Sequence, residues 1–511
     1  MKKLLQISSM VTSNSGPDLN LIKTNGNSKL QKLLIGLVRG KYKNDQEAAK
    51  SLYQTSSKSK TYLKLKSRLK ERLLDKFFVM DSEKVMHSRY DKAFYQCIRN
   101  VFAAQVMILK DMRMNAIELL RSTLQQTQHY HFTELSLTIV RLLRYDAAMK
   151  GDKDKLTHYD RLIRQFSQLQ QAELLAEKYS QMVVVEFAQK TPSDKQIRKK
   201  AFSCYRKIFE LSLKHKSRTI ELNKFKTGAR YYSIAGEHHK AISVCNQCEK
   251  YLHDHPQLIQ NVRLAEMALF KMDSCLALRD EKNGLQYALQ CEAYFNPGTM
   301  NWLIFREYDF LLSMHIGNFS RALQLFYEVT GHAKFSQQSP ERLEKWKIFE
   351  AYLNYALPAQ LPKKNFNLFK FLNEISIYSK DKKGYNFAIL VAEIILLIET
   401  DDLDKLINIA EPFRVYVARY VSRKNNLRSY YFAKLLLVLF KYQFDPVKAA
   451  LIGKKFLERL NQITPQYKGD LESVEVIPYD KLWELLLKKL KEKDNQPGNE
   501  KKLTGEFMMN A

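Results

Sequence analysis

Glycine and proline are scarce in this chain, whose 511 residues include 16 glycines and 12 prolines. Glycine is about 3% of the sequence, against roughly 7% in average proteins. Tight turns between strands and loops that cradle phosphate depend on glycine, because it adopts left-handed backbone at little steric cost. The scarcity therefore argues against such folds and favours a helical protein.

Cysteine is too sparse to form the disulfide framework of a small secreted protein. We expect the thiols to be reduced and buried, as in a cytosolic protein. The six cysteines are Cys97, Cys204, Cys245, Cys248, Cys275 and Cys291.

Long hydrophobic runs are also missing. The longest, Phe387–Ile398, is interrupted by Glu393 and is too short to span a bilayer, which takes about 20 residues. Near the N-terminus, Gln6, Ser8 and Ser9 interrupt the apolar run that a signal peptide needs. The sequence predicts a soluble, cytoplasmic protein with no membrane span.

Catalytic signatures are absent, since the chain contains no HExxH, GxSxG or Walker motif. Residues Gly36–Lys41 superficially resemble a phosphate loop, but they have one residue too few between the glycines and continue into Tyr42. The acidic cluster Asp401, Asp402 and Asp404 lacks the alternation and closing glutamate of a calcium loop, and is expected to cap a helix. We expect a non-enzymatic protein that needs no cofactor, with an enzyme of unfamiliar site as a minor alternative.

Positive charge dominates, with a formal net charge of +29 and a pI of about 9.6. Residues 1–76 alone hold 17 Lys and Arg against 5 Asp and Glu, a net charge of 17 − 5 = +12. Such an excess suits an anionic partner such as nucleic acid or an acidic membrane. A lysine-rich proteome would produce the same balance, and both interpretations stay open.

Changes in composition divide the chain into four zones. Within the basic second zone, apolar periodicity predicts helices over Lys29–Arg39, Asp45–Tyr53 and Lys60–Met80, and a last amphipathic helix is expected near Tyr479–Leu490. The zones are a flexible lead (1–28), a basic three-helix module (29–82), a helical-repeat array (83–462), and a linker with a short amphipathic helix and polar tail (463–511).

Turn-forming residues recur through the third zone at a mean spacing of about 42 residues, which is typical of stacked helical hairpins. One hairpin cannot bury its apolar face alone, so a regular period predicts an α-solenoid of about nine hairpins. The turns are expected near Asp111, Gly151, Lys190, Gly236, Arg279, Gly317, Leu361, Asp401 and Phe444.

The clearest hairpin is Phe225–Pro256. Ala229 and Ala241 are small enough to let its two helices approach closely, and Gly236 supplies the left-handed backbone of the turn. This pattern resembles the tetratricopeptide (TPR) repeat, over about four hairpins and loosely over the others. The period is longer than the 34 residues of a regular TPR, so HEAT-like or irregular helical repeats stay open.

The TPR resemblance implies a curved array whose first helices line a concave groove for a protein or peptide partner. Carried onto this chain, it places four residues on the groove face: Asn223, Lys226, Thr227 and Arg230. Neighbouring hairpins contribute Glu266, Asp273, Glu307 and Tyr308. The predicted groove is therefore mixed in charge and lacks a complete clamp for a C-terminal carboxylate.

Two basic helices suggest a nucleic-acid-binding regulator as the alternative. The layout of the N-terminal module resembles a helix-turn-helix, which would present its third helix to a DNA groove. That helix would carry Lys60, Lys64 and Arg68 opposite Tyr62, Leu65, Leu69 and Leu73. A second basic segment, 195–218, would present Lys195, Lys199, Arg206 and Lys207 to phosphates or to an acidic partner. Lysine-rich helix faces that are simply exposed to solvent would show the same sequence pattern.

A cluster of Cys245, Cys248 and nearby histidines raises the question of zinc. The two thiols share one helical face, but zinc needs four ligands around one point, and His238 would lie about 10 Å away along the helix. The repeat pattern assigns both cysteines to the buried face, where cysteine acts as a small apolar residue. We therefore expect no metal and keep Cys245 and Cys248 as a weak candidate pair.

Overall fold

A computed structural model describes residues 1, 4–5, 7–8, 11, 28–42, 44–78, 83, 86, 88–189, 195–357, 371, 385–421, 427–463 and 475–494. These residues form α-helices joined by turns and short 3-10 segments, and no strand occurs among them. The protein is therefore all-α. None of the described helices combines the length and the apolar character needed to cross a membrane.

The chain forms two compact units. Unit 1 comprises residues 1–171 and 255–261, and unit 2 comprises residues 172–254 and 262–511.

Unit 1 begins with the predicted three-helix module, whose helices start where the sequence predicts. Each start has a capping side chain that accepts a hydrogen bond from a backbone N–H of the first turn: Ser28, Asn44 and Ser59. The helices are α2 (Lys29–Val38), α3 (Asp45–Tyr53) and α4 (Lys60–Phe77).

Apolar side chains hold this module together, because α2 packs against both α3 and α4. The predicted inward face of α4 is confirmed, since Tyr62, Leu65, Leu69 and Leu73 are all buried. Leu4 and Val11, from the predicted flexible lead, also belong to this core, whereas most of the lead lies outside the described residues.

The rest of unit 1 consists of long helices that pack on their chain neighbours around Val101, Leu120, Ile139 and Leu143. These helices are α6 (Arg89–Leu109), α7 (Arg113–His129), α8 (Thr133–Met149) and the first part of α9 (Lys153–Gln189).

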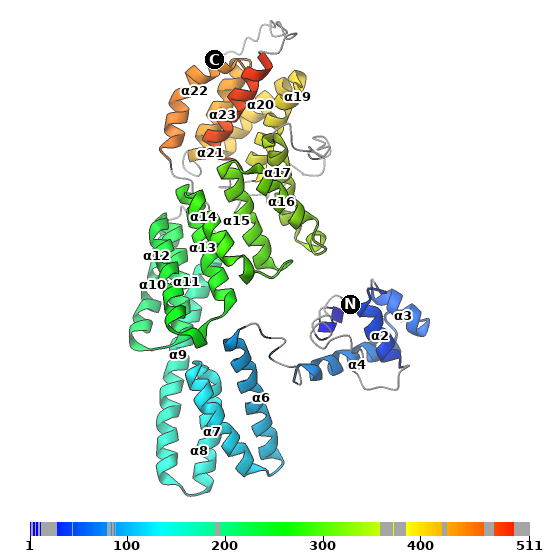
Figure 1. The fold of residues 1–511 in the computed structure, drawn as a ribbon, viewed down its shortest axis with the longest axis vertical. Coiled ribbons are helices and arrows are strands. Elements are labelled where there is room, and N and C mark those ends of the chain that lie inside the picture. The colour runs from blue at the N-terminus through cyan, green and yellow to red at the C-terminus, as the bar shows by residue number, and fades with distance from the viewer. Residues whose placement is uncertain are drawn as a thin grey trace. The chain divides into compact units, whose positions relative to one another are not determined.

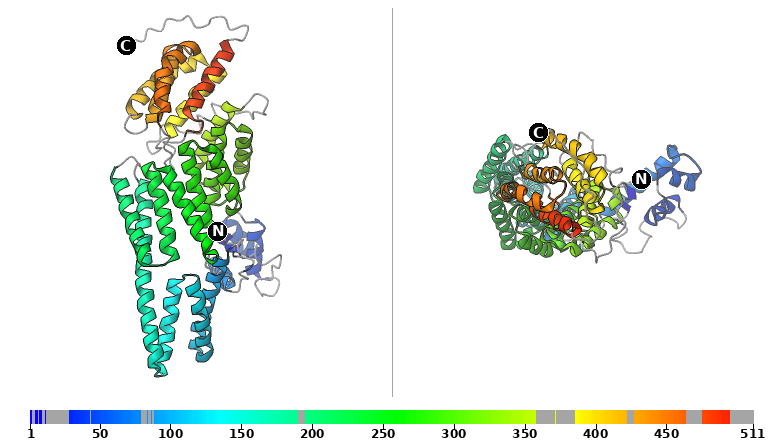
Figure 2. Two further views of the ribbon diagram at one scale, coloured as in Figure 1. Left: turned by 60° about the vertical axis from the view of Figure 1, so that its left-hand side comes forward. Right: turned by 90° about the horizontal axis from the view of Figure 1, so that it is seen from above.

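Unit 2 continues the pattern, and most consecutive helices lie side by side (Figures 1 and 2). Its helices after α9 are α10 (Lys195–Lys214), α11 (Arg218–Ala235), α12 (His238–Asp254), α13 (Asn261–Leu278), α14 (Glu281–Cys291), α15 (Met300–Ile316), α16 (Phe319–Thr330), α17 (Pro340–Ala356), α19 (Tyr385–Thr400), α20 (Leu403–Tyr420), α21 (Leu427–Lys441), α22 (Pro446–Asn461) and α23 (Tyr479–Asp494).

The predicted turns are confirmed wherever the structure describes them. Lys190 and Leu361 lie outside the described residues. At each of the other seven positions the named residue has a positive φ, between 57° and 79°. These residues are Asp111, Gly151, Gly236, Arg279, Gly317, Asp401 and Phe444.

Small residues occupy the helix crossings, as the repeat pattern predicts. Ala241, Ala322 and Ala449 are completely buried. At Gly284 a Cβ atom would lie 2.6 Å from Leu312 Cδ2, so a larger residue there would force the Leu312 side chain to move. The absence of a side chain there lets α14 approach α15.

Candidate functional site

The four residues predicted for the groove lie on α11, where three of them contact other side chains or backbone groups of the chain. Lys226 Nζ pairs with Glu266 of α13 at 2.6 Å, and the Arg230 guanidinium lies 5.5 Å from the centre of the Phe270 ring. Asn223 donates a hydrogen bond to the Thr219 carbonyl on its own helix, while Thr227 is buried. The cations of this region are therefore paired or largely covered.

Polar contacts continue from α11 onto α13 and α15. The carboxylate of Asp273 accepts hydrogen bonds from Ser233 Oγ and Tyr308 Oη, both at 3.2 Å. Burial raises the pKa of Asp273 to about 6, although these hydrogen bonds and Arg230 act in the opposite direction. Burial also lowers the pKa of Arg230. These groups join α11, α13 and α15.

The next step, from α15 to α17, is an ion-pair cluster. Glu307 pairs with Lys345 Nζ at 2.7 Å and with Arg342 Nε at 3.4 Å. The mixed charge predicted for the groove is thus largely neutralised by contacts between neighbouring hairpins.

A second region, whose contacts the sequence did not reveal, surrounds α23, the last of the described helices. Its apolar side chains Leu482, Trp483 and Leu486 are buried in the core of unit 2. At its start the Tyr479 ring stacks on Phe432 of α21, with ring centres 4.3 Å apart and planes 4° apart. The predicted amphipathic helix near Tyr479–Leu490 is confirmed and continues to Asp494.

Three lysines of α23 bind the C-terminal ends of three other helices. Lys481 donates to the His315 carbonyl in α15 at 2.5 Å, and Lys489 donates to the Tyr355 carbonyl in α17 at 2.7 Å. Lys493 donates to the carbonyls of Ile398 and Glu399 in α19, and Lys489 also pairs with the Glu399 carboxylate at 2.6 Å.

The carbonyls in the last turn of a helix lack intrahelical partners, and the helix dipole is negative there. Each of these lysines therefore places its positive charge next to carbonyl acceptors at the negative end of a helix. We refer to these helix ends, together with Arg279 and Arg428, as the α23 docking surface.

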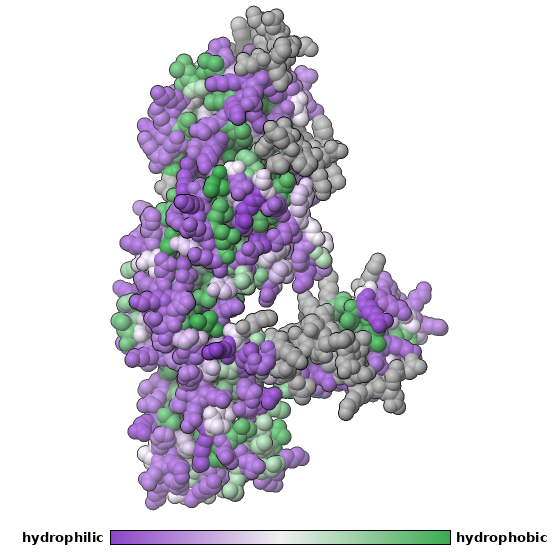
Figure 3. Space-filling view, in the orientation of Figure 1, coloured by the Kyte–Doolittle hydropathy of each residue, from purple (hydrophilic) through white to green (hydrophobic). Residues whose placement is uncertain are grey.

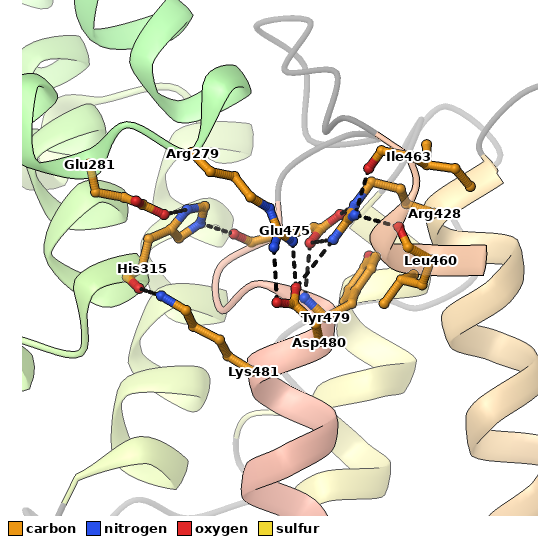
Figure 4. Close-up of polar contacts among 10 residues, drawn as sticks. All are labelled: Arg279, Glu281, His315, Arg428, Leu460, Ile463, Glu475, Tyr479, Asp480 and Lys481. Atoms are coloured by element: carbon orange, nitrogen blue, oxygen red, sulfur yellow. Dashed lines mark hydrogen bonds and ion pairs between the residues drawn. The ribbon is translucent and has the colours of Figure 1, made fainter. Parts of the chain in front are cut away.

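Buried charges set the position of the segment that leads into α23 (Figure 4). Glu475 pairs with Arg428 of α21 at 2.9 Å, and both side chains are at most 4% exposed. The same guanidinium donates to the carbonyl of Leu460 in the last turn of α22 and to that of Ile463 just after this helix. The Glu475 carboxylate also accepts a hydrogen bond from the Tyr479 N–H at 2.9 Å, at the start of α23.

Two further contacts tie this segment to α13 and α15 (Figure 4). Arg279, the left-handed residue after α13, donates to Asp480 at 2.9 Å. Burial raises the pKa of Asp480, but the hydrogen bond and the charge of Arg279 together lower it by more. The pKa of Asp480 therefore lies below its usual value. His315 Nε2 lies 2.6 Å from the Glu475 carbonyl, and burial lowers the pKa of this imidazole to about 4. The imidazole is therefore neutral near pH 7.

The basic face predicted for the third helix of the module is exposed. Lys60, Lys64 and Arg68 are all exposed on α4 and form no ion pair within the described part of the chain. Lys66 differs, because its Nζ pairs with Asp45 of α3 at 2.7 Å. Three cations on one helix therefore face solvent without a partner from the described residues.

The four cations predicted on α10 are also exposed, although two of them have neighbours. Arg206 Nε lies 3.6 Å from Glu210, and Lys207 Nζ lies 5.0 Å from the centre of the Tyr179 ring. Lys195 and Lys199 have no ion pair among the described residues.

Cys245 and Cys248 are completely buried on α12, where the repeat pattern places them. Burial raises the pKa of the Cys248 thiol to about 12 and that of Cys245 further, which disfavours the thiolate that binds metals. In the described ranges no group of three or more His, Cys, Asp or Glu side chains is arranged to hold a metal ion.

Sequence reasoning found α23 but not its partners. The lysines at 481, 489 and 493 are spaced by eight and four residues, which places them on one side of a helix, and this signal was available. Their acceptors are backbone carbonyls 94 to 166 residues away, and nothing in the identity of those residues marks them as acceptors.

Comparison with known proteins gives no match to this chain among family profiles, curated proteins or solved structures.

Proposed function

We propose that this protein is a non-enzymatic, cytoplasmic scaffold or adaptor: an α-solenoid of TPR-like hairpins that binds a protein or peptide partner through its concave groove. The observation that supports this proposal most is the way the chain holds its own α23. One amphipathic helix is bound across the ends of α15, α17 and α19 by buried apolar side chains and by lysine-to-carbonyl hydrogen bonds.

Recognition of an amphipathic helix by a row of helices is a common mode of peptide binding. The hairpins of this chain thus provide one internal example of the chemistry that the proposal requires. An external partner would contact the part of the row that α23 does not reach, where Asn223 and Lys226 lie on α11 and are partly exposed.

A photo-reactive residue at position 223 tests the proposal in the full-length protein inside its native cells. We expect light-dependent cross-links to one or a few defined proteins, identified by mass spectrometry. The same residue at Lys454, which is exposed on α22, serves as the control. Equal, diffuse labelling from both positions would argue against a partner in the groove.

The exposed face of α4 supports nucleic-acid binding as a second candidate function. Lys60, Lys64 and Arg68 are available to phosphates, whereas Lys66 is engaged with Asp45. Neutralising a cation that contacts phosphate removes about 0.9 from the slope of log affinity against log salt concentration. If all three contact phosphates, the triple change to glutamine lowers the slope by about 2.7.

Fluorescence anisotropy with a labelled DNA duplex between 50 and 200 mM salt measures this slope. A matched control replaces Lys454, Lys455 and Arg459 of α22 with glutamine, which removes the same charge from another exposed surface. Equal slopes for both triple variants would assign the binding to net charge and contradict a specific role for α4.

A further inference from the structure

The outer face of α10 carries an unusual mixture of side chains. Phe202, Phe209 and Leu213 are 46%, 43% and 73% exposed. The exposed cations Lys195, Lys199 and Arg206 lie on the same face. Most of the surface visible in Figure 3 is hydrophilic, and on α10 three large apolar side chains share one exposed face with cations.

These six residues form a single stripe. In the order 195, 199, 202, 206, 209, 213, the separations are four, three, four, three and four residues. This is the spacing of the contact seam in a coiled coil, where alternate steps of three and four keep side chains facing a partner helix. The buried residues Ile197, Ala201, Cys204 and Ile208 lie on the opposite side of α10 and pack inward.

The three cations of the stripe have few partners within the described part of the chain. Lys195 and Lys199 have no ion pair among the described residues, and Arg206 has only the exposed contact to Glu210 at 3.6 Å, one turn away on the same helix. An exposed pair of this kind contributes little to stability. The three cations can therefore be recruited by an external carboxylate at small cost.

We propose that the α10 stripe, defined as Lys195, Lys199, Phe202, Arg206, Phe209 and Leu213, binds an acidic amphipathic α-helix of a partner protein. The partner places carboxylates opposite the three cations and apolar side chains opposite Phe202, Phe209 and Leu213. This inference concerns a different surface from the groove, and it shares with the proposed function only the claim that the partner is a protein.

The mixture of cations and apolar side chains on one face favours an acidic amphipathic helix over other anionic partners. A nucleic-acid backbone would engage the cations but would leave Leu213 exposed to water. A helix that binds a membrane surface carries its apolar side chains and its cations on different faces. Here Arg206 lies between Phe202 and Phe209 on one face, and an acidic amphipathic helix can pair with such a cation while it covers the apolar side chains beside it.

The order of cations and apolar side chains differs between the two ends of the stripe. This order determines where the partner helix must carry acidic and apolar residues. Two cations lie at the start of the stripe and its last two residues are apolar. A parallel partner reads acid, acid, apolar, acid, apolar, apolar at its seam positions, and an antiparallel partner reads the reverse.

Two labelled helical peptides with these seam patterns, built from glutamate and leucine, test the proposal with the full-length protein. We expect one of them to bind with a micromolar dissociation constant in fluorescence anisotropy at 150 mM salt. The double variant K199E/R206E should weaken that binding at least about tenfold, because it places like charges at two desolvated positions. A peptide with lysine in place of glutamate should then bind this variant and not the wild type.

The control variant K454E/R459E makes the same change of charge on α22, where both side chains are exposed. It should leave peptide binding unchanged. The variant F202S/L213S should weaken binding while retaining all three cations, and circular dichroism checks that it folds.

The proposal is overturned if neither glutamate peptide binds, or if K454E/R459E weakens binding as much as K199E/R206E. It is also overturned if the α10 variants instead abolish binding to a single-stranded oligonucleotide or to phosphatidylserine vesicles while peptide binding is unaffected. Failure of cross-linking in the groove would leave this result intact, so the two proposals fail independently.

Discussion

At the scale of single residues, Asp45 illustrates how one side chain can join two helices. It lies in the first turn of α3 and accepts hydrogen bonds from Tyr62 Oη at 2.8 Å and Lys66 Nζ at 2.7 Å, both from α4. Burial alone would raise the pKa of Asp45, but the hydrogen bonds from Lys66 and Tyr62 outweigh it and bring the pKa to about 2. The ionised carboxylate is therefore part of the folded module.

We predict that acid weakens the contact between α3 and α4 through Asp45. Its folded pKa of about 2 lies below the ordinary value of 3.8, so its stabilisation is nearly complete above about pH 5 and is lost as the pH falls toward 2. Asp45→Asn should cost about 1 kcal/mol at pH 7, a modest value because the site is partly exposed. Hydrogen exchange of residues 45–77, corrected for intrinsic rates, measures the change.

The matched control is Asp75→Asn on the same α4, since Asp75 is exposed and has no ion pair among the described residues. Protection in the wild type and in this control should fall between pH 4.5 and 2.5. In Asp45→Asn this dependence should be reduced, and an undiminished dependence would contradict the assignment to Asp45.

Arg428 and Glu475 present the opposite case of a fully buried pair. Glu475→Gln would leave the Arg428 charge without its main partner, although the carbonyls of Leu460 and Ile463 still accept hydrogen bonds from it. We expect a loss of about 3 kcal/mol, the lower end of the range for breaking a buried pair. The double variant R428M/E475L should recover at least half of this loss, because it removes the uncompensated charge of Arg428, while Asp480 keeps its partner Arg279.

Urea unfolding followed by tryptophan fluorescence measures these changes. The chain has three tryptophans, Trp302, Trp346 and Trp483, and all three are buried in unit 2. A double variant less stable than Glu475→Gln alone would show that the pair contributes net stability, contrary to this prediction.

At the scale of helices, the α23 docking surface depends on lysines that act at the ends of other helices. The triple change of Lys481, Lys489 and Lys493 to alanine removes the hydrogen bonds to α15, α17 and α19. We expect hydrogen exchange within residues 475–494 to accelerate roughly 100-fold, which corresponds to about 3 kcal/mol shared among three charged hydrogen bonds. Changing Lys488 and Lys491, which are exposed on the same helix, should have little effect.

The outcome for this helix separates two roles for α23. If exchange stays slow in the triple variant, Leu482, Trp483 and Leu486 hold the helix without the lysines. In that case α23 would be an apolar cap, and its use as evidence for helix recognition would fail.

Capping residues and the spacing of apolar residues made the helices predictable. Contacts between residues far apart in the sequence could not be predicted in this way. The starts of α2, α3 and α4 were predictable because Ser28, Asn44 and Ser59 cap the chain at those points. The turn at Phe444 was found from the spacing between apolar segments, even though phenylalanine seldom adopts positive φ. Such features depend only on neighbours in the sequence.

The partners of the charged side chains, in contrast, could not be read from neighbouring residues in the sequence. Lys226 was predicted to face a groove, yet its partner Glu266 lies 40 residues along the chain. The hairpin period brings such residues together, but it does not fix which rotamers meet. Arg428 is harder still, because its interior position depends on the placement of Glu475 beyond a linker. The fold class and the faces of the helices were therefore predictable, whereas the docking surface for α23 was not.

At the scale of the whole molecule, the two units have separate hydrophobic cores. The core around α6, α7 and α8 draws its residues from unit 1, and the core around α13 to α23 draws its residues from unit 2. The six cysteines report on both cores, because Cys97 lies in unit 1 and the other five lie in unit 2.

We predict that the six thiols are unreactive in the folded protein and become reactive in two steps. All six are buried, and burial raises the pKa of Cys97 to about 11 and that of Cys275 and Cys291 to about 12, so little thiolate exists near pH 7. Brief labelling with iodoacetamide at increasing urea concentrations, followed by mass spectrometry, should show Cys97 becoming reactive at a different concentration from the unit 2 group. The five thiols of that group should respond together, because their helices belong to one compact unit. If all six become reactive at a single urea concentration, the two units unfold together and the prediction of two steps is wrong.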